Sequence, residues 1–536
     1  MSALTGTGML VRLAVRRDRV LVPFWAVFTA VIPMGFVSAF NAAAPTAAAR
    51  QDYVDTSVHN TAFIIAYGPV TGSGLGELVT WRAGFIPVIV ALVSILLVIR
   101  HTRTEEEAGR VELIGATAVG RHAGLAAALV AVLLANVLAA LLAALALMGS
   151  GLGAAGSFAH ALGLLLTGCA FTAIGAICAQ LTAGAGAARG IGFVVLGAAF
   201  LVRGFGAVSR QSGGSLEWLT WLSPIGWGAL LRPFAGDLWG AAVPLLLVSA
   251  LLAAAAFVLA GRRDLGSGLI HARPGPVAAV PSLRTPLALA WRLHRGALLS
   301  RTAGFAVVGY GLGAVAESIT RLLDDSGPGA RELMAGLGLR GSLLQQYVDG
   351  MMTMFAVVAA AYAIQAALRL RAEESGGRAE PVLATRVGRL RWAWSHFLFA
   401  LLGPALGLAV FGAALGLAHG AGTGDVAGQV PVMLEAALVQ VPAVWVFAGL
   451  AFALFGLLPR FAVGAFAVLL LSLFLGWLGA ELRLGEWVEA LSIFNHVPKP
   501  AIEQVSAAPL TVMTVLALAL IAAGAAGLRG RDIPAG

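Results

Sequence analysis

Hydrophobic residues along this chain gather in long runs, and short polar segments separate the runs. A helical run of about 20 apolar residues is long enough to cross the ~30 Å hydrocarbon core of a membrane. Runs of roughly this length predict twelve membrane-spanning helices. They cover residues 20–41, 83–100, 123–148, 157–181, 188–207, 238–260, 302–319, 351–369, 395–418, 431–457, 461–480 and 509–528. The pattern therefore predicts an all-α polytopic membrane protein.

The composition agrees with this prediction, since 59% of the 536 residues are hydrophobic and only 11% are charged. A soluble globular chain carries roughly 25% charged residues. The single lysine, Lys499, stands between two prolines rather than after a glycine-rich turn, so the chain has no P-loop for ATP. Cys169 and Cys178 have no histidine at metal-ligand spacing, and we expect no metal site. These features indicate a transport subunit rather than an enzyme, with no cofactor of its own.

The positions of the arginines predict the orientation of the chain in the membrane. If the connections between spans alternate sides, 25 of the 35 basic residues lie in one set and 10 in the other. Cytoplasmic loops carry the excess of Lys and Arg, so both termini are expected in the cytoplasm. Glu435 is the only clear carboxylate within a predicted span. The net charge of +9 is thus a sign of topology, and nucleic-acid binding is not needed to explain it.

A repeat divides the chain into two halves. The loop after the second predicted span (101–121) and the loop after the eighth (369–391) match at an offset of 268 residues, and we call them the first and second glutamate loops. In the loops the matching residues are Gly109-Arg110 with Gly377-Arg378, Glu112 with Glu380, Ala116-Thr117 with Ala384-Thr385, and Val119-Gly120-Arg121 with Val387-Gly388-Arg389. Outside the loops, Arg263-Asp264 returns as Arg531-Asp532, and Glu217-Trp218 as Glu486-Trp487. The sequence predicts two parallel six-span repeats, 1–268 and 269–536.

An amphipathic segment precedes the first span of each predicted repeat. Residues 10–19 and 287–295, the latter within a segment near 284–296, place apolar residues on one helical face and arginines on the other. This pattern is typical of a helix that lies in the membrane interface. The alternative is that each segment is only the helical start of the span that follows.

The two glutamate loops are rich in carboxylates, although only Lys and Arg in a cytoplasmic loop help to set the orientation of the chain in the membrane. The glutamates are Glu105, Glu106, Glu107 and Glu112 in the first loop, and Glu373, Glu374 and Glu380 in the second. A solvated helix with a pair such as Glu106–Arg110 would account for one loop. Because the pattern occurs twice on otherwise divergent sequence, we favour a docking surface for a cytosolic partner.

This arrangement of spans, interfacial helix and glutamate-rich loop resembles the type-2 ABC export permease, in which the loop forms a coupling helix seated in the ATPase subunit. The fused double unit and the segment 221–227 further resemble the actinobacterial polyketide-antibiotic exporter permeases of the tetronasin type. The resemblance covers essentially the whole chain. It implies drug efflux and antibiotic resistance at the bacterial cell membrane. MgATP would be hydrolysed on a separate ABC ATPase subunit, two copies of which would bind one permease.

The resemblance also assigns residues to the docking of the ATPase. They are Glu105, Glu106, Gly109, Arg110 and Glu112 in the first loop, and Glu373, Glu374, Gly377, Arg378 and Glu380 in the second. The second loop departs from the pattern because Pro381 stands where the first has Leu113. A proline there shortens or restarts the helix, so we expect the two docking contacts to be unequal.

In this family the substrate path runs between the halves, lined by the first, second and fifth spans of each. By position, the path residues would be Met34, Phe36, Phe40, Asn41, Phe193, Phe200 and Phe205, with Phe305, Tyr310 and Phe466 in the second half. Such a path suits a hydrophobic or amphipathic compound taken from the inner leaflet. The alternative for each residue is ordinary helix packing.

Glu435 follows Pro431 by four positions, which predicts a place in the first turns of its helix, and its role is either structural or in transport.

The chief alternative function is a proton-coupled multidrug antiporter of the major-facilitator type, but the first glutamate loop lacks the aspartate of that family's loop motif. A membrane enzyme is a third class, with Asp52, Asp55 and His59 too sparse to form a site. Segments 42–82 and 320–350 are expected to form short helices on the outer side.

Overall fold

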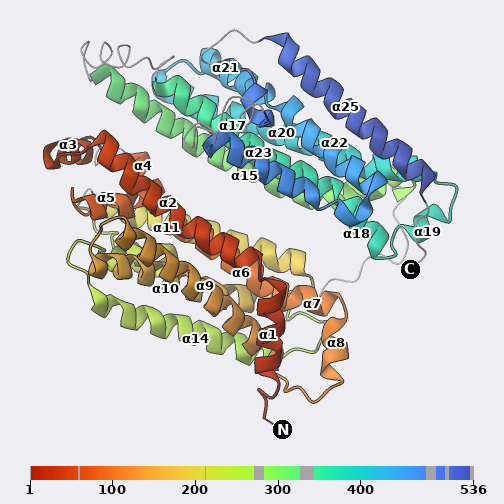
Figure 1. The fold of residues 1–536 in the computed structure, drawn as a ribbon, viewed down its shortest axis with the longest axis horizontal. Helices are drawn as coiled ribbons and strands as arrows, with labels where there is room; N and C mark the ends of the chain where they lie inside the picture. Colours follow the sequence, from red (N-terminus) through yellow and green to blue (C-terminus); the bar gives the residue numbers. More distant parts are fainter. Residues whose placement is uncertain are drawn as a thin grey trace. The chain divides into compact units, whose positions relative to one another are not determined.

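The computed structural model describes residues 2–57, 61–211, 213–270, 283–325, 343–478, 491–500 and 506–531. Within these ranges every regular element is a helix (Figure 1). The chain divides into two compact units, Met1–Gly275 and Pro276–Gly536. Each unit has its own buried core, and each is described by itself.

Among the described residues, ten helices are long and apolar enough to cross a membrane. They are Leu21–Ala43, Ile86–Glu107, Ala123–Gly149, Ala154–Leu181, Ala185–Gln211, Trp239–Gly261, Tyr347–Ser375, Arg389–Thr423, Val426–Leu457 and Ala507–Gly530. Each overlaps one of the predicted spans. The remaining two predictions, 302–319 and 461–480, fall on helices that are not among the ten. The protein is therefore an all-helical membrane protein with about ten candidate spans, and the count of twelve stays a prediction.

The first unit consists of long helices joined by short ones. In chain order they are α1 (Thr7–Arg17), α2 (Leu21–Ala43), α3 (Ala47–Ser57), α4 (Thr61–Tyr67), α5 (Leu75–Arg82), α6 (Ile86–His101), α7 (Arg103–Glu107), α8 (Arg110–Gly115), α9 (Ala123–Gly149), α10 (Ala154–Leu181), α11 (Ala185–Gln211), α12 (Leu219–Leu222), α13 (Trp227–Leu230) and α14 (Ala242–Gly261). The segment 42–82 forms three short helices, as the sequence predicted.

Helix α10 is the central helix of the first unit, where it contacts α6, α9, α11 and α14. A buried polar chain crosses this core: Ser94 of α6 donates to Asn136 of α9 (3.2 Å), which donates to Thr172 of α10 (3.3 Å). Hydrogen bonds between side chains hold helices together where lipid offers no hydrophobic driving force. Asn136 is thus explained by packing within the unit.

The described part of the second unit also consists of long helices joined by short ones. They are α15 (Pro286–Asp325), α17 (Leu343–Ala367), α18 (Arg369–Ser375), α19 (Glu380–Leu383), α20 (Arg389–Thr423), α21 (Val426–Leu438), α22 (Val441–Leu457), α23 (Gly464–Leu478) and α25 (Ala507–Gly530). Phe355 and Phe411 stack at 4.2 Å in its core. Gly456 and Gly524 let α22 and α25 touch backbone to backbone, since a Cβ on Gly456 would lie 2.1 Å from the Gly524 carbonyl oxygen.

The two predicted interfacial segments fold differently. In the first unit α1 is a separate helix, with Met9 and Leu13 exposed on one face, and residues 18–20 divide it from α2. In the second unit, residues 286–296 form the start of the 40-residue α15 and continue without a break into the region 302–319. The segment near 284–296 therefore has the form of the alternative, the helical start of the segment that follows, and its place in the membrane interface stays a prediction. Most of segment 320–350 lies outside the described residues.

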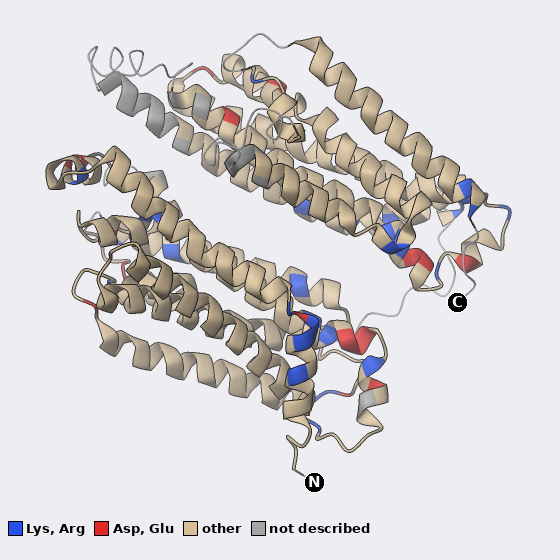
Figure 2. Ribbon diagram, viewed as in Figure 1, with Lys and Arg blue, Asp and Glu red and all other residues tan. Residues whose placement is uncertain are grey.

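Charged residues concentrate at one end of each unit (Figure 2). In the first unit this end carries α1, α7 and α8, and in the second it carries α18 and α19. The glutamate loops therefore lie where the long apolar helices end. This placement defines the candidate site of the protein.

Candidate functional site

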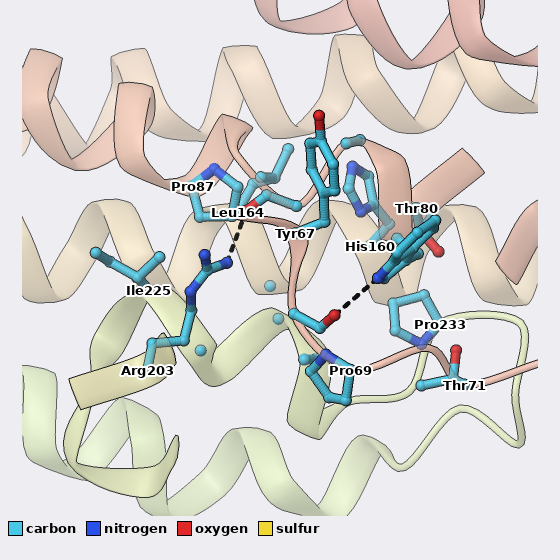
Figure 3. Close-up of a pocket in the computed structure, with 18 of the residues that line it drawn as sticks. Tyr67, Pro69, Thr71, Thr80, Pro87, His160, Leu164, Arg203, Ile225 and Pro233 are labelled. Atoms are coloured by element: carbon cyan, nitrogen blue, oxygen red, sulfur yellow. Dashed lines mark hydrogen bonds between the residues drawn. The ribbon is translucent and has the colours of Figure 1, made fainter. Parts of the chain in front are cut away.

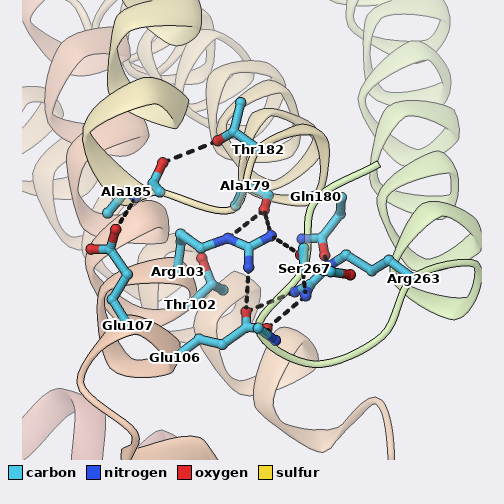
Figure 4. Close-up of polar contacts among 12 residues, drawn as sticks. Thr102, Arg103, Glu106, Glu107, Ala179, Gln180, Thr182, Ala185, Arg263 and Ser267 are labelled. Carbon is cyan, nitrogen blue, oxygen red and sulfur yellow. Dashed lines mark hydrogen bonds and ion pairs between the residues drawn. The ribbon is translucent and has the colours of Figure 1, made fainter. Parts of the chain in front are cut away.

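Glu106 forms the centre of a buried ion-pair network in the first glutamate loop (Figure 4). Its side chain is only 8% exposed, and its two oxygens accept from Arg263 at 2.6 and 2.9 Å. The backbone N–H of Gly266 donates to it at 2.6 Å, and Arg103 Nη1 lies 3.0 Å away. Two arginines and one amide thus satisfy a carboxylate that water hardly reaches.

Arg103 and Arg263 extend this network into the helix bundle. Arg103 is buried and donates to the carbonyl of Ala179 at 2.9 and 2.7 Å and to the carbonyl of Ser267 at 2.9 Å. Arg263 donates through Nε to Gln180 at 2.7 Å. The network therefore ties α7 to the end of α10 and to the segment that follows α14.

The neighbours of Glu106 bind two other helices. Glu105 pairs with Arg17 at the end of α1 and with Arg110 at 2.6 Å. Glu107 accepts from the N–H of Ala185 at 2.9 Å and so caps the first turn of α11. Arg110 pairs with Glu105 and not with Glu106, the partner that helical spacing suggested. The charge and hydrogen bond of Glu105 raise the pKa of Arg110.

Asp18 fixes the junction of α1 and α2 to the end of α6. Its carboxylate lies 2.6 Å from His101 Nε2 and 2.9 Å from Arg100 Nη1, and only 3% of the side chain is exposed. Burial by itself raises the pKa of Asp18. The hydrogen bond with His101 and the charges of His101, Arg100 and Arg17 outweigh burial, so the pKa of Asp18 lies below its ordinary value.

The second glutamate loop contains matching ion pairs. Glu374 pairs with Arg531 at 2.5 Å, and the two residues are separated by 157 positions, as are Glu106 and Arg263. Glu373 pairs with Arg378 at 2.9 Å, which corresponds to Glu105 with Arg110. Both ion pairs of the second loop thus join residues that stand 268 positions after the members of an ion pair in the first loop.

The backbone of the two loops also matches. Gly109 and Gly377 both adopt positive φ angles, 70° and 67°, which an L side chain rarely adopts. Each precedes a short helix that projects from the loop, α8 with six residues and α19 with four. Pro381 stands in the first turn of α19, and the shorter helix agrees with the effect predicted for a proline at this place.

The loops differ in their attachment and at their tips. Among the described residues, no ion pair joins the second glutamate loop to α15, whereas Glu105 pairs with Arg17 of α1 in the first. At the tip of α8, Glu112 is exposed and Leu113 is 74% exposed. Glu380 of α19 is also exposed. Among the predicted docking residues, Glu106 and Glu373 are thus buried in the protein, whereas Glu112 and Glu380 face outward.

The structure separates the predicted path residues into three groups by their exposure. Phe40 and Phe305 are buried in their own units, against Tyr53 and against Phe355 with Phe411. Phe36, Phe200 and Phe466 are partly buried, whereas Met34, Asn41, Phe193, Phe205 and Tyr310 are exposed on the surface of their unit. Only the exposed members have side chains free to face a substrate.

Glu435 lies near the end of α21 rather than in its first turns. The helix begins at Val426, because Asp425 accepts from the N–H of Gly428 at 3.0 Å and caps it. Pro431 is therefore inside the helix, and Glu435 is exposed four residues later. The prediction of an N-terminal position is wrong, and an explanation by the helix dipole no longer applies.

The sequence analysis missed a buried arginine in the first unit. Arg203 of α11 is 3% exposed and donates to the carbonyls of Ile65 (2.6 Å), Ala66 (2.8 Å) and Gly84 (3.1 Å). It lies beside a cavity at the end of the unit opposite the glutamate loop. The available signal was a second arginine well inside the apolar run 188–207, but it was counted among the basic residues of the outer side.

Two comparisons relate the chain to known proteins. A family model described as the C-terminal domain of multidrug efflux system permease Rv1217c matches residues 283–529. The chain is also 38% identical, over 533 residues, to the multidrug efflux system permease protein Rv1217c of Mycobacterium tuberculosis. The match covers 99% of this chain and 96% of that protein.

Proposed function

This chain belongs to the family of the multidrug efflux system permease Rv1217c, and from that relationship we propose that it is the membrane subunit of an ATP-driven exporter. The exported compounds would be hydrophobic or amphipathic, and polyketide antibiotics are the class that the sequence resemblance suggests. The energy would come from MgATP hydrolysed on a separate ABC ATPase subunit. That subunit would dock on the two glutamate loops as a homodimer.

The construction of the first glutamate loop is the observation that carries this proposal. Glu105, Glu106 and Glu107 attach the loop to neighbouring segments of the unit, while α8 presents Glu112 and Leu113 to the surroundings. A rigid base with an exposed apolar and acidic tip suits the groove of a protein partner, since an exposed leucine gains free energy when a partner covers it. We therefore assign the docking contact to the tip of α8.

The recurrence of the ion pairs supports one ATPase at each loop. Glu106–Arg263 and Glu374–Arg531 would fix equivalent loops in two six-span repeats, twelve spans in total, with both termini in the cytoplasm. The four-residue α19 offers a smaller tip than the six-residue α8. The two ATPase contacts would consequently be unequal in strength.

The proposed path would be lined by the exposed members of the predicted set. Met34, Phe193, Phe205 and Tyr310 are 40%, 42%, 66% and 51% exposed in their units. Their apolar surfaces suit a hydrophobic or amphipathic cargo. The cargo would leave from the inner leaflet of the bacterial cell membrane.

Charge and polarity reversal at the tip of α8 tests ATPase docking directly. The permease would be purified from its own cells with and without the double change Glu112→Lys and Leu113→Asp. We expect the unchanged permease to retain an ABC ATPase subunit and vanadate-sensitive ATP hydrolysis, and the variant to lose both. Leu216→Asp with Glu217→Lys is the matched control, because those two residues are also adjacent and exposed but belong to a connection predicted to lie on the outer side.

Transport measurements separate the proposal from the proton-coupled alternative. Export that vanadate stops and that persists with an uncoupler present supports the ATP-driven mechanism. Export that an uncoupler alone abolishes, with no ATPase retained by the unchanged permease, contradicts it and favours the antiporter. In that outcome Glu435, an exposed carboxylate within a candidate span, becomes the first residue to change.

A further inference from the structure

The first unit encloses a cavity of about 60 Å³ at the N-terminal end of α6 (Figure 3). Its wall is formed by segment 67–71, by the end of α5 and start of α6, by α10, and by the chain around α12 and α13. Most of the lining is apolar or glycine. Three of its polar side chains, Arg203, His160 and Thr220, carry a buried polar atom that has no hydrogen-bond partner in the structure.

Arg203 brings to this cavity a positive charge that contacts backbone carbonyls and, 5.0 Å away, the ring of Phe200. Its Nη atoms bind backbone carbonyls, but among the described residues no carboxylate forms an ion pair with it. Its Nε–H is buried and has no acceptor. A buried charge is normally paired, because removing it from water costs several kcal/mol.

His160 and Thr220 add two more polar atoms without a partner. His160 is 7% exposed and Thr220 is 2% exposed, and neither His160 Nε2 nor Thr220 Oγ1 has a hydrogen bond in the structure. In Figure 3, Arg203 lies on one side of the cavity, and His160 and Thr80 lie on the other. Buried polar atoms without a partner are rare in native proteins, and several around one cavity indicate a group that binds there.

We propose that this cavity binds a small monovalent anion, in particular a carboxylate group. The anion would neutralise Arg203 and accept hydrogen bonds from the Arg203 Nε–H and the Thr220 hydroxyl, with His160 as a third contact. The volume suits a head group with one or two waters, since a site for a whole drug-sized molecule needs about 300–1,000 Å³. The anion is either a free ion or the acid group of an amphipathic compound whose apolar part remains outside.

The histidine and the arginine of the site do not recur at the repeat offset. At the positions 268 residues after His160 and Arg203 stand Gly428 and Leu471, whose side chains offer neither a charge nor a hydrogen bond to an anion. The site also lies far from the first glutamate loop, because the 16 residues of α6 separate the two by roughly 24 Å. Anion binding can therefore be measured without an ATPase or transport, and it does not depend on the proposed function.

Binding measurements on the purified full-length protein test this site. Acetate, decanoate and decanol would be titrated in neutral detergent and chloride-free buffer, with calorimetry and the fluorescence of Trp81, which lines the cavity, as readouts. We expect acids to bind and decanol not to bind. Arg203→Met should weaken acid binding at least tenfold, and Thr220→Val should weaken it several-fold. Because Thr220 Oγ1 has no partner, Thr220→Val leaves every hydrogen bond of the protein intact.

Arg50→Met is the matched control for Arg203→Met. Arg50 also donates to backbone carbonyls, those of Ala44 and Pro45, but it does not line the cavity. Acid binding should be unchanged in this variant. Equal affinities for acetate and decanoate would identify a free anion, and tighter binding of decanoate would identify the acid group of an amphiphile; either supports the site. The proposal is overturned if decanol binds as well as decanoate, if neither acid binds, or if Thr220→Val binds both acids like the unchanged protein.

Discussion

Glu106 and Arg263 are 157 positions apart in the chain, yet two hydrogen bonds of 2.6 and 2.9 Å join their side chains. The pair links the short helix α7 to the segment that follows α14, and both lie at the charged end of the first unit. Glu374 and Arg531 form the same link in the second unit. Glu106 and Glu374 therefore have a structural role that does not depend on contact with a partner.

Loss of the Glu106 carboxylate should destabilise the protein strongly. Glu106→Gln leaves the buried guanidinium groups of Arg103 and Arg263 without their counter-charge, and we expect a loss of about 3–5 kcal/mol in the free energy of unfolding. Unfolding in mixed micelles of neutral detergent and SDS measures this loss. Glu112→Gln, at an exposed glutamate of the same loop, should change stability by less than about 0.5 kcal/mol. Similar effects of the two changes would argue against the network.

The Glu374–Arg531 pair should show a measurable coupling energy. Single changes Glu374→Gln and Arg531→Gln remove the same ion pair, so their combined effect is expected to be smaller than the sum by about 0.5–3 kcal/mol. A double-mutant cycle on the unfolding free energy measures this difference. Additivity of the two changes would mean that the pair contributes nothing, and a cycle of Glu374→Gln with the distant Arg50→Gln provides the additive reference.

Glycine should be required at the turn of each loop. Gly109→Ala places a Cβ in open space but keeps φ at 70°, so backbone strain alone should cost about 1–2 kcal/mol. Gly377→Ala should have an effect of similar size, since its φ is 67° and its Cβ also meets nothing. Gly124→Ala in α9 is the control, because it has equal space and no positive φ, and it should be neutral or stabilising. Thermal unfolding midpoints of the three variants test this order.

Asp18 should contribute stability over the neutral range and lose it only in acid. Its pKa in the folded protein lies below the ordinary value of 3.8, so its contribution is fully present above that value and disappears as the pH falls through the folded pKa. We expect Asp18→Asn to be less stable than the unchanged protein at pH 7. The difference should shrink below pH 3.8. A gap that widens on acidification would show that Asp18 does not bind its partners as the charged form.

Local sequence patterns were sufficient to predict the helices and the two loops. Apolar runs located ten of the candidate spans, and the matches around Gly109 and Gly377 located two loops with the same backbone geometry. The partners of the loop glutamates were not predictable in this way. Helical spacing suggested Glu106–Arg110, but the partner of Glu106 is Arg263, and only the packed fold brings that residue near.

The sequence was less informative about where helices begin and about the surroundings of one arginine. The break between α1 and α2 occurs where Asp18 binds the end of α6, whereas α15 continues from residue 286 into the region 302–319 without a break. Pro431 suggested the beginning of a helix, but the cap formed by Asp425 starts α21 five residues earlier. Arg203 was assigned to the outer side because a sequence does not show the carbonyls that surround a buried guanidinium.

The three consecutive glutamates of α7 give the first loop a mechanical property. Glu105 binds α1, Glu106 binds the segment after α14, and Glu107 binds α11, so the short helix is attached in three directions at once. A force applied at the tip of α8 therefore meets little compliance in the loop. Such a load will displace α1, α11 and the end of α14 together, with the stiffness of the whole bundle rather than that of a surface loop.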